Sequence, residues 1–144
     1  MNFTVCAYKN AGDTLVLNPL TLNAIGAGAS TNQLITLEPQ HDYKVVGERL
    51  TEAFEFCEKE PFLNKGISGN LPTLLGFKNP GKFAKEYLHV IVSMRNDLGT
   101  IIFTPMKREG SGYVNNGQIK VELLLNAAPE QLGEALLQAF ESCK

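Results

Sequence analysis

Apolar residues recur at helical spacing in two segments of the chain that are similar to each other. Residues 46–57, VGERLTEAFEFC, and residues 132–143, LGEALLQAFESC, match at Gly, Glu, Leu, Ala, Phe, Glu and Cys. In each segment the apolar positions form one stripe, which is typical of a helix that packs against a sheet. Asp42 precedes the first segment, and Pro129 and Glu130 precede the second, as helix-start signals. We therefore predict two equivalent helices, the second of which runs to the last residue.

Upstream of each helix, two apolar runs flank a turn rich in Asn, Gly and Asp. Residues 5–19 align without a gap on residues 91–105, so each copy is predicted to begin with a β-hairpin. Pro19 and Pro105 are predicted to end these hairpins, because proline cannot donate a hydrogen bond to a central strand ladder. Self-similarity at a long fixed offset indicates two copies of one supersecondary unit.

A Gly- and Asn-rich loop and then a further strand are predicted between the hairpin and the helix of each copy. The clearer strand is in the second copy, where Ile119, Val121 and Leu123 alternate with charged residues. This alternation is typical of a half-buried antiparallel strand. Residues 33–37, QLITL, occupy the matching place in the first copy. The two predicted loops are residues 23–32 and 108–117.

The connector between the copies, residues 60–88, matches neither of them. The Asn79-Pro80 pair predicts a short helix that ends near Tyr87, and another turn or two of helix fits residues 71–75. We predict one α+β domain with a curved, mostly antiparallel sheet of about six to eight strands, helices packed on it and the connector helix covering an edge or end. Its parts are pseudo-repeat one (1–59), the connector (60–88) and pseudo-repeat two (89–144), within a single domain of residues 1–144.

The charge of the chain argues against a nucleic-acid binder. The formal net charge is −2, whereas a protein that neutralises phosphates usually has a clear basic excess. The distribution is uneven, since residues 1–59 have four Lys or Arg and seven Asp or Glu, while residues 60–88 have four and two. The first copy is therefore acidic and the connector basic.

The sequence contains no constellation that predicts catalysis or metal binding. Cys6, Cys57 and Cys143 form no CxxC pair and have no His at ligand spacing, so we expect packed, reduced thiols and neither zinc nor a disulfide framework. His41 beside Asp42 fits a local turn or capping role, and His89 opens a strand. We predict no catalytic residues, no metal and no cofactor. No apolar run approaches the roughly 20 residues of a membrane span, so we expect a cytoplasmic protein without membrane contact.

Two groups of polar residues are candidates for contact with a partner. One is the outer face of the first helix, where an acidic surface could meet a basic one. The other is a loop that mixes charges of both signs with an aromatic residue. Ordinary solvated surface is the alternative for both groups. The candidates are Glu48, Glu52, Glu55 and Glu58 on the helix, and Arg108, Glu109 and Tyr113 in the loop.

From the connector onward, the sequence resembles a known family. Its pattern is LGFK before a short helix, a hairpin ending in Thr-Pro, a Gly-rich loop with an aromatic residue, and a terminal helix that begins PEQLG. This pattern is similar to that of the immunity proteins of contact-dependent growth inhibition (CDI) in proteobacteria. The similarity covers most of the chain and is best from Leu75 to Cys143. It departs at the Gly-rich loop and at Ala128, where a serine-like cap is more usual.

The resemblance implies a protector without enzymatic activity. Such a protein binds and neutralises the toxic C-terminal domain of a large secreted CDI effector, and we expect a monomer in a 1:1 complex. The toxins are often nucleases, and a ribonuclease is favoured here, because an acidic surface suits the basic cleft of an enzyme that grips nucleic acid.

Two other functions fit parts of the sequence. A repeated strand-rich unit ending in a helix is also similar to the Whirly class of single-stranded nucleic-acid-binding folds, although the acidic pI of about 5.7 counts against it. A small enzyme with its site between the copies would need a polar cluster that the sequence does not contain. A filter-binding titration with oligonucleotides at low salt separates the first of these from an immunity protein.

Overall fold

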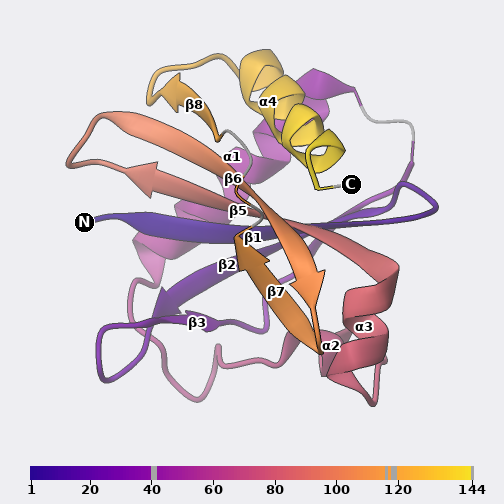
Figure 1. Ribbon diagram of the computed structural model, residues 1–144. Helices are drawn as coiled ribbons and strands as arrows, with labels where there is room; N and C mark the ends of the chain where they lie inside the picture. Colours follow the sequence, from indigo (N-terminus) through magenta and orange to yellow (C-terminus); the bar gives the residue numbers. More distant parts are fainter. Residues whose placement is uncertain (40–41, 116, 118–119, 144) are drawn as a thin grey trace.

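The elements follow the predicted α+β order. The computed structural model describes residues 1–39, 42–115, 117 and 120–143. Eight strands and four helices form within these residues (Figure 1). The first half contains β1 (Phe3–Asn10), β2 (Leu15–Leu22), β3 (Gly28–Ser30), β4 (Ile35–Leu37) and α1 (Tyr43–Lys59). The connector forms α2 (Leu71–Leu74) and α3 (Pro80–Glu86), and the second half contains β5 (Tyr87–Arg95), β6 (Thr100–Glu109), β7 (Gly112–Asn115), β8 (Val121–Leu124) and α4 (Pro129–Glu141).

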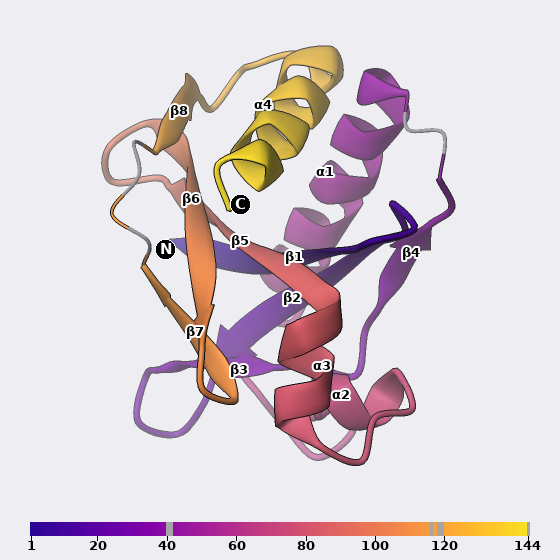
Figure 2. The same ribbon diagram turned by 45° about the vertical axis from the view of Figure 1, so that its right-hand side comes forward.

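The two halves are related by an approximate two-fold arrangement. The strand order is β3-β2-β1-β5-β6-β7, with β4 also paired to β2 and β8 also paired to β6. The antiparallel β1–β5 pair joins the halves at the centre of the curved sheet. Helices α1 and α4 lie side by side over one face, whereas α2 and α3 lie at the opposite end of the molecule (Figures 1 and 2).

The gap-free alignment of the two hairpins is wrong in its first strand. Val5 pairs with Pro19, and Val90 pairs with Pro105, so the structural equivalent of Val5 is Val90 and not Ile91. The second hairpin has one more residue in its turn. A one-residue slip moves every side chain to the other face of a strand, and accordingly Val90 is fully buried while Ile91 is only half-buried.

The sequence led us to expect that the two prolines end the hairpins. This prediction was wrong, because both prolines lie inside strands, one in β2 and the other in β6. Residues 15–17 of β2 pair with β4 and residues 20–22 pair with β3, so Pro19 occupies the gap between two partners. Pro105 lies at the same place between β8 and β7. The Pro19 carbonyl oxygen accepts a hydrogen bond from the Thr31 hydroxyl in this gap. In a strand, the backbone nitrogen and carbonyl oxygen of one residue point to the same side. The Pro19 nitrogen therefore also faces the gap, and its missing N–H removes no hydrogen bond from a strand ladder.

The Gly-rich loops contain more strand than expected. The first holds β3, and the second is largely a hairpin formed by the end of β6 with β7. In β8, Val121 and Leu123 are half-buried and Glu122 is exposed, which confirms the predicted alternation for the residues that the structure describes; Ile119 lies outside them. Helix α4 ends at Glu141 and so does not run to the last residue.

The helix starts agree with the sequence. The Asp42 side chain caps α1 by accepting a hydrogen bond from the Lys44 amide. Ala128 offers no side-chain cap to α4, and instead the Gln131 side-chain oxygen accepts a hydrogen bond from the Ala128 amide. The predicted stripes of both helices face the core. Their buried members are Val46, Leu50, Ala53, Phe54 and Cys57 on α1 and Leu132, Leu136, Ala139 and Phe140 on α4.

Matched glycines allow α1 and α4 to pack against each other. A Cβ on Gly47 would overlap the carbonyl oxygen of Pro129, and a Cβ on Gly133 would overlap the carbonyl oxygen of Tyr43. These two contacts are equivalent under the two-fold arrangement. The glycine shared by the two repeats is therefore required by the contact between the helices, a reason that the repeat alone does not reveal.

A second apolar cluster lies on the other face of the sheet. Tyr8 and Val16 point to it, whereas their neighbours along β1 and β2 point to the main core. Leu71 of α2 and Phe83 of α3 are buried in this cluster, which confirms the helices expected in the connector. Its rings touch edge-on or stack, as between Phe83 and Tyr87 at 5.0 Å. The connector thus covers a face that neither repeat covers with its own helix.

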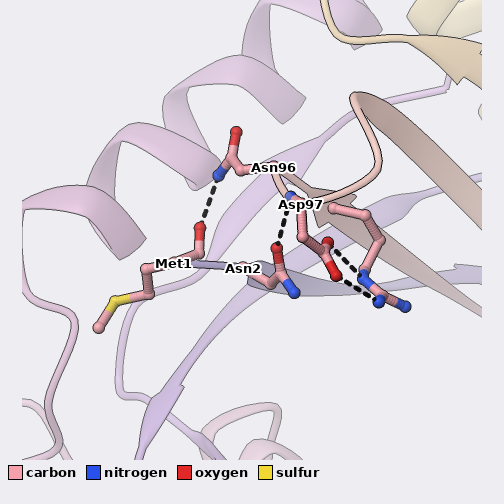
Figure 3. Close-up of polar contacts among 5 residues, drawn as sticks. Met1, Asn2, Asn96 and Asp97 are labelled. Carbon is pink, nitrogen blue, oxygen red and sulfur yellow. Dashed lines mark hydrogen bonds and ion pairs between the residues drawn. The ribbon is translucent and has the colours of Figure 1, made fainter.

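Polar contacts join the first residues of the chain to the β5–β6 turn (Figure 3). The Asn96 side-chain amide donates to the Met1 carbonyl at 2.6 Å, and the Asp97 backbone amide donates to the Asn2 side chain at 3.4 Å. Arg95 forms a two-pronged hydrogen bond with Asp97, which lowers the pKa of that carboxyl to about 2. These contacts order the start of β1 beside its partner β5.

Candidate partner-binding surface

The exposed carboxylates of α1 and α4 form one acidic layer over the main core, which we call the acidic helical surface. The four glutamates predicted on α1 are all exposed. Glu134 on α4 is also exposed and corresponds to Glu48 under the repeat alignment, a match that the sequence could have supplied. The carboxylates of this surface are Glu48, Glu52, Glu55, Glu58, Glu130, Glu134 and Glu141.

Few cations neutralise the acidic helical surface. Lys44, Arg49 and Lys59 are the basic residues of α1, and α4 has none between Pro129 and Glu141. Arg49 pairs with Glu52 at 2.9 Å. Within the described part of the chain, Glu48, Glu55 and Glu58 have no cation within ion-pair distance. The surface therefore presents a net negative field to a partner.

Basic residues gather on the opposite side of the molecule, where α3 meets the β6–β7 hairpin. Lys82, Lys85 and Arg108 line an open hollow of about 590 Å³, together with Asn79, Gly81, Glu86, Gly110 and Ser111. We call this feature the basic hollow. The basic connector is visible in the sequence, but its proximity to Arg108 is not, because Arg108 lies more than twenty residues further along the chain than Lys85.

The structure places the seven predicted contact residues on two separate surfaces. The α1 glutamates belong to the acidic helical surface, whereas Arg108 and Glu109 are exposed at the end of β6 near the basic hollow. Tyr113 is only partly exposed. Its ring contacts Tyr8 and His89, and its hydroxyl donates a hydrogen bond to the Tyr87 carbonyl at 2.8 Å. Through these contacts Tyr113 stabilises the β6–β7 hairpin.

The titratable groups of the interior are held in their neutral forms. His89 is buried, donates a hydrogen bond from Nδ1 to the Ala7 carbonyl and stacks on Tyr8 at 4.4 Å. Burial lowers the pKa of His89 to about 4. Burial also raises the pKa of Cys6 to about 12 and that of Cys57 to about 11. A neutral thiol is a poor nucleophile, so these cysteines are suited to packing.

The cysteines are free, and two of them occupy equivalent places. The Cys57 thiol donates to the Thr4 carbonyl at 3.6 Å, and the Cys143 thiol donates to the matching His89 carbonyl at 3.2 Å. Among the described residues, no group of three or more His, Cys, Asp or Glu side chains could hold a metal ion. No helix within them has the length and hydrophobicity that a bilayer crossing requires. His41 lies outside the described residues.

Comparisons with known proteins support the similarity noted in the sequence. The model of the CDI immunity protein family matches residues 67–143. A protein of unknown function from Neisseria meningitidis, NMB0488, is 15% identical with a TM-score of 0.76 over 100% of this chain and 96% of that one. A chain of the CdiA-CT/CdiI toxin and immunity complex from Yersinia pseudotuberculosis is 12% identical with a TM-score of 0.72 over 100% and 98%. The search of curated proteins found no match.

Proposed function

Because the chain belongs to the CDI immunity protein family, whose model matches residues 67–143, we propose that it binds and neutralises a toxin. The partner is the cognate C-terminal domain of a large secreted CDI effector, and the association is non-covalent. One copy of the chain binds one toxin domain in the cytoplasm of the cell that it protects. Protection requires no chemistry from this chain, since occupying the toxin is sufficient.

The acidic helical surface is the observation that supports a contact site. Seven glutamates against three cations on α1 and α4 make it a surface for a partner with a basic face. A nuclease, and a ribonuclease in particular, fits this description, because its cleft must attract phosphates. An acidic layer placed over such a cleft would compete with the nucleic acid for the same cations.

The rigidity of the two helices adds to this proposal. The close contact of Gly47 and Gly133 with the neighbouring backbone fixes the spacing of α1 and α4. The carboxylates are therefore presented from a prearranged layer, so that less conformational entropy is lost on binding. Opposite charge on the two partners also speeds their encounter, and this effect weakens as salt screens it.

Charge reversal on α1 tests the site. Glu48→Lys combined with Glu55→Lys removes two carboxylates that have no ion-pair partner among the described residues. We expect the toxin Kd to rise by about tenfold or more, mainly through slower association, with a smaller effect at high salt. Surface plasmon resonance with a catalytically inactive toxin domain measures both rate constants.

A matched control carries the same change in net charge at another place. Glu38→Lys combined with Glu122→Lys alters two exposed carboxylates that belong neither to the acidic helical surface nor to the basic hollow. If both double variants lose affinity equally, the effect is one of net charge and the toxin does not bind at α1. If the unaltered protein binds no toxin encoded beside its gene, the proposed function itself is wrong.

A further inference from the structure

The basic hollow is a feature that the proposed toxin contact does not use. It lies on the side of the molecule where the connector helices are, away from the α1–α4 layer (Figure 2). Its three cations outnumber the single carboxylate in its lining, Glu86. We propose that the basic hollow is a second binding surface, which takes an acidic segment of a protein.

The cations of the basic hollow are available for a partner. Among the residues that the structure describes, neither Lys82, Lys85 nor Arg108 has a carboxylate within ion-pair distance. All three side chains are exposed. Lys82 and Lys85 are three residues apart on α3, so they project from the same side of this helix. Arg108 reaches the hollow from a different element, β6.

Tertiary contacts hold these three cations in one place. A Cβ on Gly81 would lie 3.7 Å from the Ser111 Cβ, which shows how closely α3 approaches the tip of the β6–β7 hairpin. Beneath the hairpin, Tyr113 is fixed by its hydrogen bond to the Tyr87 carbonyl. Phe83 anchors α3 in the same aromatic cluster. The donors of the hollow are thus arranged before a partner arrives.

The chemistry of the hollow favours carboxylates over a nucleic acid. An arginine binds a carboxylate with two parallel hydrogen bonds, and the lysines supply further donors. A nucleic acid needs a row of cations that follows its phosphates, but Glu86 interrupts any such row in this lining. Single strands also stack on exposed rings, whereas the nearby Tyr113 ring packs against Tyr8 and His89.

In the part of the chain that the structure describes, the two-fold arrangement has no second copy of this surface. Arg108 corresponds to Leu22 of the first repeat, which instead bridges to Phe62 of the connector. Neither α2 nor α3 has an equivalent among the other elements of the described residues. The basic hollow therefore belongs to the part of the molecule that is specific to the connector and the second hairpin.

The test uses the immunity protein alone with a fluorescent peptide of alternating glutamate and glycine. Fluorescence anisotropy is followed for the unaltered protein and for a triple variant, Lys82→Gln with Lys85→Gln and Arg108→Gln. We expect binding that weakens with salt, and a Kd about tenfold or more higher for the triple variant. Arg108→Lys keeps the positive charge but loses the two parallel hydrogen bonds of the guanidinium group. It should weaken binding less than Arg108→Gln does.

A control variant with the same net charge distinguishes an effect of the hollow itself from an effect of the overall charge of the protein. Lys44→Gln with Lys65→Gln and Lys120→Gln alters exposed lysines elsewhere, and it should leave peptide affinity nearly unchanged. Circular dichroism confirms that both variants are folded. Absence of peptide binding to the unaltered protein, or equal losses in the two triple variants, overturns the proposal. Tighter binding of an oligonucleotide of equal formal charge also overturns it, in favour of a nucleic-acid site.

Discussion

One face of the sheet, which we call the helical face, is covered by α1 and α4 and keeps the two-fold relation between the repeats. The other, the connector face, is covered by α2 and α3 and does not keep this relation. On the helical face α1 and α4 have matched stripes, matched glycines and matched thiol contacts. On the connector face the aromatic cluster draws on β1, β5 and β7 together with α2 and α3. The difference shows that the repeated segments form the main core, whereas the unmatched segments form a separate surface.

This difference bears on where the molecule could encode specificity for a partner. The repeated core residues are constrained by packing, so they have little freedom to encode a partner. The exposed residues of both faces are not constrained in this way, and specificity between partners arises from differences in affinity at such positions. The acidic helical surface and the basic hollow are therefore separate places where recognition could change without loss of the fold.

The largest effect is expected from the matched glycines. Gly47→Ala and Gly133→Ala should each destabilise the protein by about 4 kcal/mol or more, because the added methyl overlaps backbone atoms that cannot rotate away. Urea unfolding measures the loss. Gly112→Ala is the control, since a Cβ there meets nothing within 4 Å. A small effect at one glycine and a large one at the other would show that the helix contact is not symmetric.

The matched leucines should show whether the two repeats contribute equally to the core. Leu50 and Leu136 are both fully buried. Leu50→Ala and Leu136→Ala are each expected to cost about 3 kcal/mol, from lost burial and the cavity left behind. Leu124→Ala, at an exposed position, should change the stability little. Unequal losses at the two buried leucines in thermal unfolding would contradict an evenly shared core.

The connector face should give the protein its acid sensitivity. The pKa of His89 is about 4 in the folded state, against about 6.5 in the unfolded chain. Between these pH values the unfolded state binds a proton that the folded state does not. Protonation of the unfolded chain at His89 therefore costs no stability well above pH 6.5 and about 3 kcal/mol by pH 4. His89→Gln should remove this part of the pH dependence in urea unfolding, whatever its effect on stability at neutral pH; an unchanged pH slope would contradict the assignment.

The smallest effect is expected at the hairpin turns, where equivalent positions hold different residues. Asp13 has a φ of 65° and Gly99 a φ of 72°, both in the left-handed region. Gly99→Ala should destabilise by about 1 kcal/mol, because a Cβ is unfavourable there. Asp13→Gly should change stability by less than about 0.5 kcal/mol, since aspartate tolerates this conformation. Differential scanning calorimetry can resolve the two, and a reversed order would show that the turns differ in backbone strain.

Much of the fold could be read from the sequence because local signals and periodicity agree. The cap at Asp42, the helix start at Pro129, the two apolar stripes and the connector helix at Pro80 were all predicted from spacing and residue type. The failures share a cause. The alignment of Val5 with Ile91 and the interpretation of Pro19 as a strand end both depend on which strand lies alongside, and this is a property of pairing between distant segments.

The candidate site could be predicted only where it depends on local spacing and not on contacts between distant segments. Helical spacing was sufficient to place the four α1 glutamates on one exposed side, and the structure adds Glu130, Glu134 and Glu141 beside them only because α4 packs on α1. Spacing could not show that Arg108 lies near Lys82 and Lys85, or that Tyr113 is held by Tyr87.

By itself the sequence determined the repeat, the helices and their buried faces, because these follow from residues a few positions apart. Only the tertiary structure decided the register of the hairpins, the role of Gly47 and Gly133, and the separation of the charged residues onto two faces. Those features arise where segments far apart in the chain meet, and contact across such distances leaves no periodic pattern in one sequence.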